Sequence, residues 1–236
     1  MQQNLRVPLM DISGSDKSFC LAAWQSTFRE LDIEIPDNVE DRTKAMFDAI
    51  CKTKKKTPQE LISMLAKEGH HTPFEFCYLQ FNIVADIATH IHCLKHRIGI
   101  SINTESARYK ELEDKHYIPN DWDSYTSQSY GANRVKIQLQ NHTLQGEKLY
   151  HYAINELQNN EGLTRKRAKE TARYFLGYNK MLNFTMAFNM RSFMHFQRLR
   201  NSPNAQLEIR TIAQMMLEQV RETNRVPLTL TAFGYE

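Results

Sequence analysis

Apolar and polar residues alternate with a short period in one stretch of the chain and with a longer, helical period in others. Between residues 76 and 86 the apolar positions alternate with polar ones: Cys77, Leu79, Phe81 and Ile83 against Tyr78, Gln80 and Asn82. This period of two predicts a half-buried strand. Asp86 is a candidate N-cap for a helix over residues 87–97, so a strand passes directly into a helix.

The helical period recurs in several longer segments. Thr57 and Glu60 form a candidate capping box with Pro58 in the first turn, before an apolar stripe that ends at Gly69. Asp16 is a candidate cap for a helix over residues 17–31. Further helices are predicted over residues 136–160, 164–182, 185–199 and 205–223, with a long polar and aromatic loop over 110–135. These elements predict an α+β, helix-rich fold with one mainly antiparallel sheet of roughly three to five strands.

Composition is that of an ordinary globular protein. The 236 residues include 41% hydrophobic and 24% charged residues, with a formal net charge of +3, so any anion-binding site must be local. The chain has no apolar run of eighteen residues, and its first residues lack the apolar core of a signal peptide. Its four cysteines are scattered without a C-x-x-C pair. We therefore expect a cytoplasmic protein with reduced thiols and no membrane-spanning segment.

Residues 95–109 concentrate cations and hydroxyl groups. Arg97 and Arg108 can each grip phosphate oxygens bidentately, whereas Lys95 acts as a point charge. Hydroxyls and backbone N–H groups around Ser106-Ala107-Arg108 complete an anion-binding nest. A helix C-terminus with cations that offset its dipole would explain Lys95 and Arg97, but not Arg108. We interpret the segment as an anion site.

Other interpretations of the polar residues are less favoured. His92 and His96 have the i, i+4 spacing of two metal ligands, but Lys95 would place a cation beside the ion, so we predict no metal. Ser101 or Ser106 near His96 could act as a nucleophile, although a serine in a basic loop more often donates to phosphate. The lysine-rich segment 51–61 is typical of a solvated loop before a helix.

A second polar group lies among methionines and phenylalanines in residues 172–210. Asn189, His195 and Arg200 need partners there, because an unpaired buried amide costs roughly 1–3 kcal/mol. A planar heterocycle with ring acceptors would satisfy all three. This favours a nucleotide or flavin ligand without naming it.

These blocks together resemble the signature of flavin-dependent thymidylate synthases. The family's Arg-His-Arg triplet, spacer and Ser-x-Arg-Tyr is matched by Lys95-His96-Arg97 and Ser106-Ala107-Arg108-Tyr109. Its Gly-His-x-Thr-Pro-Phe-Glu block is matched by residues 69–75, its Ala-Arg pair by Ala172-Arg173, and its C-terminal block by residues 189–209. The chain departs from the signature at Lys95, at His92, where a Gln is often found, and in a spacer one residue longer, near Gly99-Ile100.

The resemblance implies a single domain over residues 1–236 that converts dUMP to dTMP. FAD would be the cofactor, with methylenetetrahydrofolate and NADPH as co-substrates, in a homotetramer that binds neither nucleic acid nor membrane. Arg200 and His70 would be catalytic. The residues implied for dUMP are His92, Lys95, Thr104, Glu105, Ser106, Ala107, Arg108, Arg173 and Arg200. Those implied for FAD are Ser26, His70, Thr72, Lys95, His96, Arg97, Asn189 and His195.

Two further hypotheses are compatible with the sequence. The same flavin scaffold could hydroxymethylate dUMP or act on dCMP, which product analysis would distinguish. A nucleic-acid-binding module using the lysines of residues 52–56 with Arg97 and Arg108 predicts steep salt dependence. That module would leave Asn189, His195 and Arg200 unexplained.

Overall fold

The computed structural model describes residues 4–25, 34, 36–119 and 130–235. Its elements follow the chain in this order: β1 (Leu9–Ser13), α1 (Asp16–Ala23), α2 (Val39–Thr53), α3 (Pro58–Lys67), η2 (Thr72–Glu75), β2 (Tyr78–Asp86), α4 (Ile87–Leu94), β3 (Ile100–Thr104), α6 (Tyr130–Asn159), α7 (Arg165–Ala172), η3 (Arg173–Phe175), β4 (Met181–Asn189), α8 (Met190–Arg200), α9 (Leu207–Glu222) and α10 (Pro227–Ala232). Among these described residues, no helix is both long and apolar enough to cross a bilayer.

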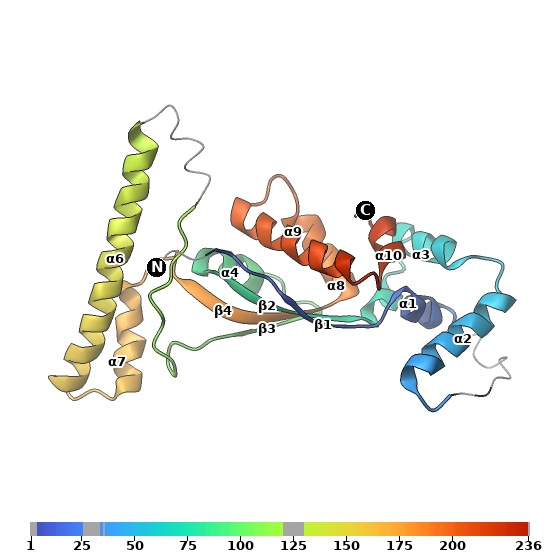
Figure 1. Ribbon diagram of the computed structural model, residues 1–236, viewed down its shortest axis with the longest axis horizontal. Helices are drawn as coiled ribbons and strands as arrows, with labels where there is room; N and C mark the ends of the chain where they lie inside the picture. Colours follow the sequence, from blue (N-terminus) through green and yellow to red (C-terminus); the bar gives the residue numbers. More distant parts are fainter. Residues whose placement is uncertain (1–3, 26–33, 35, 120–129, 236) are drawn as a thin grey trace. The chain divides into compact units, whose positions relative to one another are not determined.

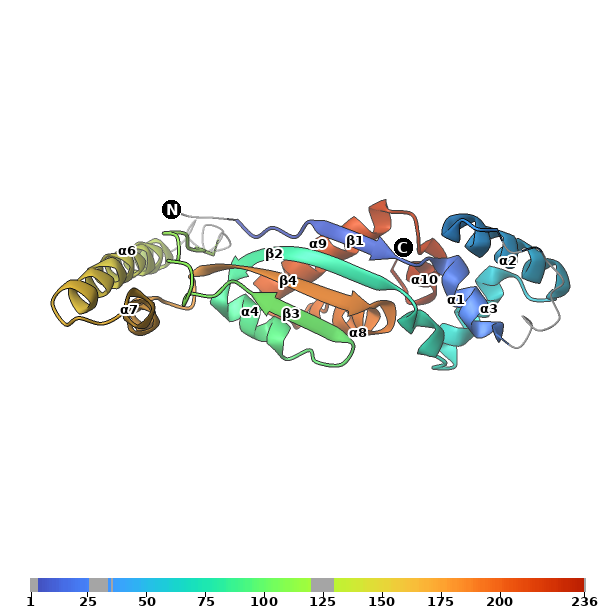
Figure 2. The same ribbon diagram turned by 90° about the horizontal axis from the view of Figure 1, so that it is seen from below.

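Four strands form one sheet in the order β1-β2-β4-β3, as Figure 2 shows. β1 pairs antiparallel with β2, with Ile12 opposite Leu79 and Leu9 opposite Phe81, and the register shifts between Leu9 and Asp11. The prediction of a helix-rich α+β fold with one mainly antiparallel sheet is confirmed. The half-buried strand predicted over residues 76–86 is β2, whose inward positions are fully buried.

The chain divides into two compact units. Unit 1 comprises Met1–Arg6, Ile83–Lys95 and Asn103–Phe184; unit 2 comprises Val7–Asn82, His96–Ile102 and Thr185–Glu236. Each unit is described by itself below. That the whole chain is a single domain stays a prediction.

The core of unit 2 is rich in aromatic side chains. Phe81 from β2 stacks on Phe193 from α8 with ring centroids 5.8 Å apart, and Phe188 from β4 meets Phe196 edge to face at 5.3 Å. α8 and α9 run side by side (Figure 1), and Gln197 Nε2 donates to the carbonyl of Ala213 at 2.9 Å. The methionines and phenylalanines of residues 184–196 are therefore core, as their composition indicates.

Asp16 contributes to unit 2 in a way that its position in the sequence did not indicate. Ser15, not Asp16, is the N-cap of α1, in a capping box with Ser18. The carboxylate of Asp16 instead accepts from the backbone N–H of Leu228 at 2.7 Å and of Thr229 at 3.1 Å, at the start of α10. Asp16 thus caps a helix more than two hundred residues away along the chain, and burial raises the pKa of its carboxyl group.

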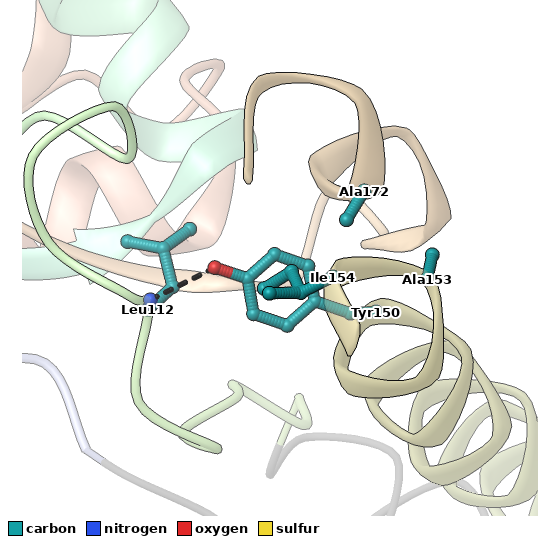
Figure 3. Close-up of a cluster of buried hydrophobic side chains, with 5 residues drawn as sticks. All are labelled: Leu112, Tyr150, Ala153, Ile154 and Ala172. Carbon is teal, nitrogen blue, oxygen red and sulfur yellow. Dashed lines mark hydrogen bonds between the residues drawn. The ribbon is translucent and has the colours of Figure 1, made fainter. Parts of the chain in front are cut away.

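Unit 1 is built on α6 and α7, which lie side by side (Figure 1). Figure 3 shows its apolar cluster, formed by Leu112, Tyr150, Ala153, Ile154 and Ala172. Tyr150 is fully buried, and its hydroxyl accepts from the backbone N–H of Leu112 at 3.1 Å. This hydrogen bond fixes the segment that follows residue 109 against α6.

Several boundaries predicted from the sequence hold. The capping box of Thr57 and Glu60 opens α3, Asp86 caps α4 by accepting from Thr89 N at 3.0 Å, and α9 matches the helix predicted over residues 205–223. That helix is not the last one, because α10 follows it. α6 begins within the predicted loop over residues 110–135, so that loop is shorter than expected. Of the helix predicted over 17–31, α1 is present and residues 26–33 lie outside the described residues.

The helices predicted over residues 164–182 and 185–199 are wrong between Ala172 and Asn189. α7 ends at Ala172 and the strand β4 occupies Met181–Asn189. Phe184, Met186 and Phe188 are spaced by two and are all buried, which is strand periodicity that the dense apolar composition concealed. The helix predicted to reach residue 97 ends at Leu94, and β3 follows at Ile100.

Candidate functional site

In unit 2, the segment His96–Ile102 lies along α8. The helix begins at Asn189, whose side-chain oxygen accepts from Ser192 N at 2.8 Å as the N-cap. Asn189 N then donates to the carbonyl of Gly99 at 3.1 Å, and Ser192 Oγ donates to the carbonyl of Ile98 at 2.7 Å. Two segments of the signature, about ninety residues apart in the sequence, are therefore joined by hydrogen bonds.

The far end of α8 contacts the same segment through side chains. Arg200 Nε donates to His96 Nε2 at 2.8 Å. The buried His96 ring lies edge-on to Phe196, with centroids 4.9 Å apart, and 6.5 Å from the His195 ring. The structure thus brings together His96, Asn189, His195 and Arg200, while their roles stay predictions.

The surface of these two segments is rich in hydrogen-bond donors. His96–Ile102 and α8 contain no aspartate or glutamate, while Arg97, Arg191, Arg198 and Arg200 carry positive charge. Arg97 and His195 are exposed, and Arg198 Nη2 donates to His195 Nδ1 at 3.1 Å. Arg191 forms an ion pair with Glu75 at 2.7 Å. This surface is suited to an anionic ligand.

The predicted residues His70 and Thr72 lie where α3 passes into η2. Gly69 ends α3 with a φ of +74°, and both His70 and Thr72 are exposed. The neighbouring His71 is structural: its Nε2 donates to the carbonyl of Ala66 at 3.2 Å and its ring packs against Phe233. Of the two adjacent histidines, His70 is therefore the one that faces solvent. The predicted flavin residue Ser26 lies outside the described residues.

The phosphate nest predicted from the sequence belongs to unit 1. Arg108 N donates to Ser106 Oγ at 3.3 Å, and Ala107 packs against the apolar cluster that includes Ala172. Ala172 directly precedes Arg173, which is exposed with its guanidinium 6.0 Å from the Tyr174 ring. The Ser106–Arg108 loop and the residue before Arg173 therefore pack on the same apolar cluster.

Glu170 was not predicted from the sequence, although it orients Arg108. Its Oε1 accepts from Arg108 Nε at 2.8 Å, and its Oε2 accepts from Arg167 at 3.3 Å. These cations lower the pKa of the Glu170 carboxyl group, chiefly through the hydrogen bond from Arg167. The signal in the sequence is a lone acidic residue in the basic helix RKRAKETA.

The remaining predicted nucleotide residues in unit 1 are partly committed to the fold. Thr104 Oγ1 lies 2.7 Å from Nε2 of His90, whose pKa is lowered by burial. Glu105 Oε1 accepts from Asn183 N at 2.7 Å, while Glu105 N donates back to Asn183 O at 2.9 Å. His92 is half-buried and Lys95 is exposed. The hydrogen bonds of Thr104 and Glu105 therefore hold the chain segment that directly precedes Ser106.

Two of the four cysteines are unsuited to act as nucleophiles. Cys20 and Cys77 are buried, and burial raises the pKa of each thiol to about 12. A thiolate nucleophile needs a lowered pKa, so neither residue serves as one near neutral pH. Within the described part of the chain, no three His, Cys, Asp or Glu side chains are grouped as a metal site would require.

Comparison with known proteins identifies the family. The family model described as "Thymidylate synthase complementing protein" matches residues 8–226. A flavin-dependent thymidylate synthase from Thermotoga neapolitana is 30% identical over 228 residues, covering 96% of this chain and 89% of the relative. One from Ehrlichia ruminantium (strain Gardel) is 32% identical over 182 residues and covers 73% of this chain, which spans only 58% of that relative's length.

A solved structure shares the fold. The UMP/dUMP methylase PolB from Streptomyces cacaoi, crystallised with 5-Br dUMP, superposes with a TM-score of 0.74 at 25% sequence identity, covering 98% of this chain and 95% of that one. With the family model matching residues 8–226 and a relative 30% identical over 96% of this chain, the chain belongs to the family of flavin-dependent thymidylate synthases.

Proposed function

We propose that this protein methylates dUMP to dTMP, with FAD as cofactor, methylenetetrahydrofolate as one-carbon donor and NADPH as reductant. The observation that carries the proposal is the docking of His96–Ile102 on α8, with Arg200 bonded to His96 at 2.8 Å. Residues from two separate signature blocks form one donor-rich surface there. Similarity to flavin-dependent thymidylate synthases and to the UMP/dUMP methylase PolB supports the same chemistry.

The residues of unit 2 fit a flavin dinucleotide. FAD carries a pyrophosphate and a ring with several acceptors, and the exposed donors on this surface match both. Arg97 and His195 would hold the cofactor with Asn189 and His96 behind them, and His70 and Thr72 would contribute from the end of α3. When bound and reduced by NADPH, FAD would supply the hydride that activates the pyrimidine. The rest of the chemistry depends on positioning by the protein.

Arg200 is the residue proposed to act on the base. Activation of uracil at C6 places enolate charge on O4, and a guanidinium aimed at O4 stabilises that charge as in an oxyanion hole. The half-buried position of Arg200 strengthens this electrostatic interaction. No protein thiol takes part, which agrees with the raised pKa of Cys20 and Cys77.

Unit 1 would bind the nucleotide's phosphate and sugar. With its Nε bonded to Glu170, Arg108 can direct its terminal amino groups toward phosphate, and Ser106, Ala107 and Arg173 complete the site. The predicted His92, Lys95, Thr104 and Glu105 would border it. We propose a homotetramer in which flavin sites are shared between subunits, and a single domain over residues 1–236.

A ribonucleotide is the second candidate substrate. PolB is a UMP/dUMP methylase, and its similarity to this chain covers nearly the whole of both. Hydroxymethylation of dUMP and action on dCMP are further reactions that the same scaffold could support.

Product analysis tests the proposal and separates these substrates. The purified protein should be yellow and release FAD on denaturation. After anaerobic reduction with NADPH, it would be mixed with methylenetetrahydrofolate and dUMP, UMP or dCMP, and the nucleotide formed identified by mass. We expect dTMP from dUMP. A preparation that never takes up FAD, or that leaves all three nucleotides unchanged, would contradict the proposal.

A further inference from the structure

We propose that His96 is a positioning residue for Arg200, acting as a neutral acceptor that aims the guanidinium without neutralising it. The inference rests on the proposed function, because it takes Arg200 as the residue that contacts the pyrimidine. It also assigns His96 a role other than the flavin contact implied by the family resemblance.

The hydrogen bond defines the protonation state of His96. An arginine side chain has donors and no acceptor, and it stays protonated in proteins. Since Arg200 Nε donates to His96 Nε2 at 2.8 Å, Nε2 must present its lone pair. The ring is then neutral, with its proton on Nδ1.

The surroundings of His96 hold the ring in place. Its side chain is only 9% exposed, and its ring packs edge to face with Phe196, with centroids 4.9 Å apart. Both Phe196 and Arg200 come from α8. Phe196 packs on the His96 ring, and Arg200 donates its hydrogen bond to that ring. A buried, immobile acceptor restricts the rotamers of Arg200 at little entropic cost on ligand binding.

The neutral hydrogen-bond partner of Arg200 differs from the charged partners of Arg108 and Arg191. Arg108 and Arg191 each pair with a carboxylate, Glu170 and Glu75, at 2.8 and 2.7 Å. Arg200 forms no such ion pair within the part of the chain that the structure describes, and its terminal amino groups have no protein partner there. Its full charge therefore remains available for a developing oxyanion, which a carboxylate partner would have offset.

The geometry also makes the interaction sensitive to pH. Among the described residues, His195 and Arg200 from α8 contact His96, Arg198 contacts His195, and Lys95 and Arg97 are adjacent to His96 in the chain. These groups are cations or become cations in acid. A proton on Nε2 would remove the acceptor and repel Arg200, so nucleotide affinity should fall as the pH is lowered.

Two variants of His96 distinguish its role as a hydrogen-bond acceptor from the effect of its size. In His96→Gln the side-chain oxygen can replace Nε2 as an acceptor and does not titrate, whereas His96→Phe keeps a ring and loses the acceptor. Affinity for dUMP would be measured calorimetrically on the flavin-loaded protein between pH 5.5 and 8, together with flavin content, kcat and KM. We expect His96→Gln to bind dUMP within about threefold of the wild type with a flat pH profile, and His96→Phe to bind at least about tenfold more weakly. Both should retain flavin.

The tautomer of His96 provides a test independent of turnover. Nitrogen NMR of the labelled wild-type protein without nucleotide should show a neutral ring protonated on Nδ1. A ring protonated on Nε2, loss of flavin from both variants, or equal dUMP affinity in His96→Phe and the wild type would overturn the inference. Failure of the wild type to bind dUMP or UMP would refute the proposed function instead, which distinguishes the two.

Discussion

Gly99 turns the chain against the first turn of α8, where a side chain on it would collide with Ser192 Oγ. Its φ is +65°, and an added Cβ would also lie 2.5 Å from Asn189 Nδ2. Both side chains are held in place by hydrogen bonds, since Asn189 caps the helix and Ser192 donates to the carbonyl of Ile98. Gly99 lies at the longer spacer of the signature. The turn at this position favours glycine.

We predict that Gly99→Ala destabilises the protein by about 2–4 kcal/mol, from left-handed backbone strain of about 1–2 kcal/mol plus overpacking of similar size. Urea denaturation would measure the loss. Gly69→Ala is the matched control, because Gly69 has a φ of +74° and nothing within 4 Å of its Cβ position. The control should lose only about 1 kcal/mol. Equal losses would show that the contact with Ser192 has no energetic weight.

Arg200→Ala should retain flavin and lose turnover. The side chain is proposed to stabilise charge on the pyrimidine, and removing one such donor costs roughly 10²–10³ in kcat. Flavin absorbance and the rate of dTMP formation would be compared in the same preparation. Arg221→Ala is the control, since it removes a cation that pairs with Glu218 on α9. Activity within about twofold of the wild type in both variants would remove Arg200 from the site.

The caps of α3 and α4 and the strand β2 could be predicted from the sequence because they depend on neighbours in the chain. Thr57 and Glu60 lie three residues apart, as do Asp86 and Thr89, so their hydrogen bonds are local. β2 was recognisable from strict alternation. Where a cap or an alternating pattern lies within a few consecutive residues, the sequence alone is enough to predict the element.

The rest depends on partners far along the chain. Asp16 looked like the cap of its own helix, but its carboxylate serves α10. β4 has the spacing of a strand, yet its methionines and phenylalanines continue without a break into α8 and hid the boundary at Asn189. The candidate site shows the same limit: residue types were recognisable, whereas the bond from Arg200 to His96 was not.

The environment of His151 predicts that its contribution to the stability of the folded protein decreases as the pH rises. Its ring lies between two carboxylates, with Nδ1 2.9 Å from Glu111 and Nε2 2.8 Å from Asp114. Burial opposes the charged ring, but the hydrogen bonds that the ring donates to Asp114 and Glu111 outweigh burial and raise the pKa of His151. A raised folded-state pKa contributes stability that is fully present below the unfolded value of about 6.5 and is lost as the pH rises through the folded value.

His151→Gln should remove this part of the pH dependence. Thermal unfolding would be followed from pH 5.5 to 8.5, and the difference in Tm between the wild type and the variant should shrink as the pH increases. His142→Gln, an exposed histidine on the same helix α6, is the matched control and should run parallel to the wild type. A difference for His151→Gln that stays constant with pH would mean that the ring carries no charge in this position.

Among the described residues of unit 1, Lys180 is the charged side chain with the smallest exposed fraction. It is 2% exposed, its Nζ donates to the carbonyl of Glu113, and it lies 3.7 Å from Glu147 Oε1, which His116 Nδ1 approaches to 3.3 Å. Burial lowers the pKa of Lys180, and the charge of Glu147 opposes that shift. Lys180→Met should cost about 3 kcal/mol or more in urea denaturation, because it leaves the buried Glu147 carboxylate with His116 alone.

The double variant Lys180→Met, Glu147→Leu distinguishes a charge effect from a packing effect. Replacing both members of a buried pair by apolar side chains of similar volume is often close to neutral, so the double variant should recover most of the loss seen in the single one. Lys166→Met on the exposed face of α7 provides the surface control and should change stability by less than about 0.5 kcal/mol. If the stability loss of the double variant equals the sum of the losses of Lys180→Met and Glu147→Leu, Lys180 stabilises unit 1 through its bond to Glu113 and not through Glu147.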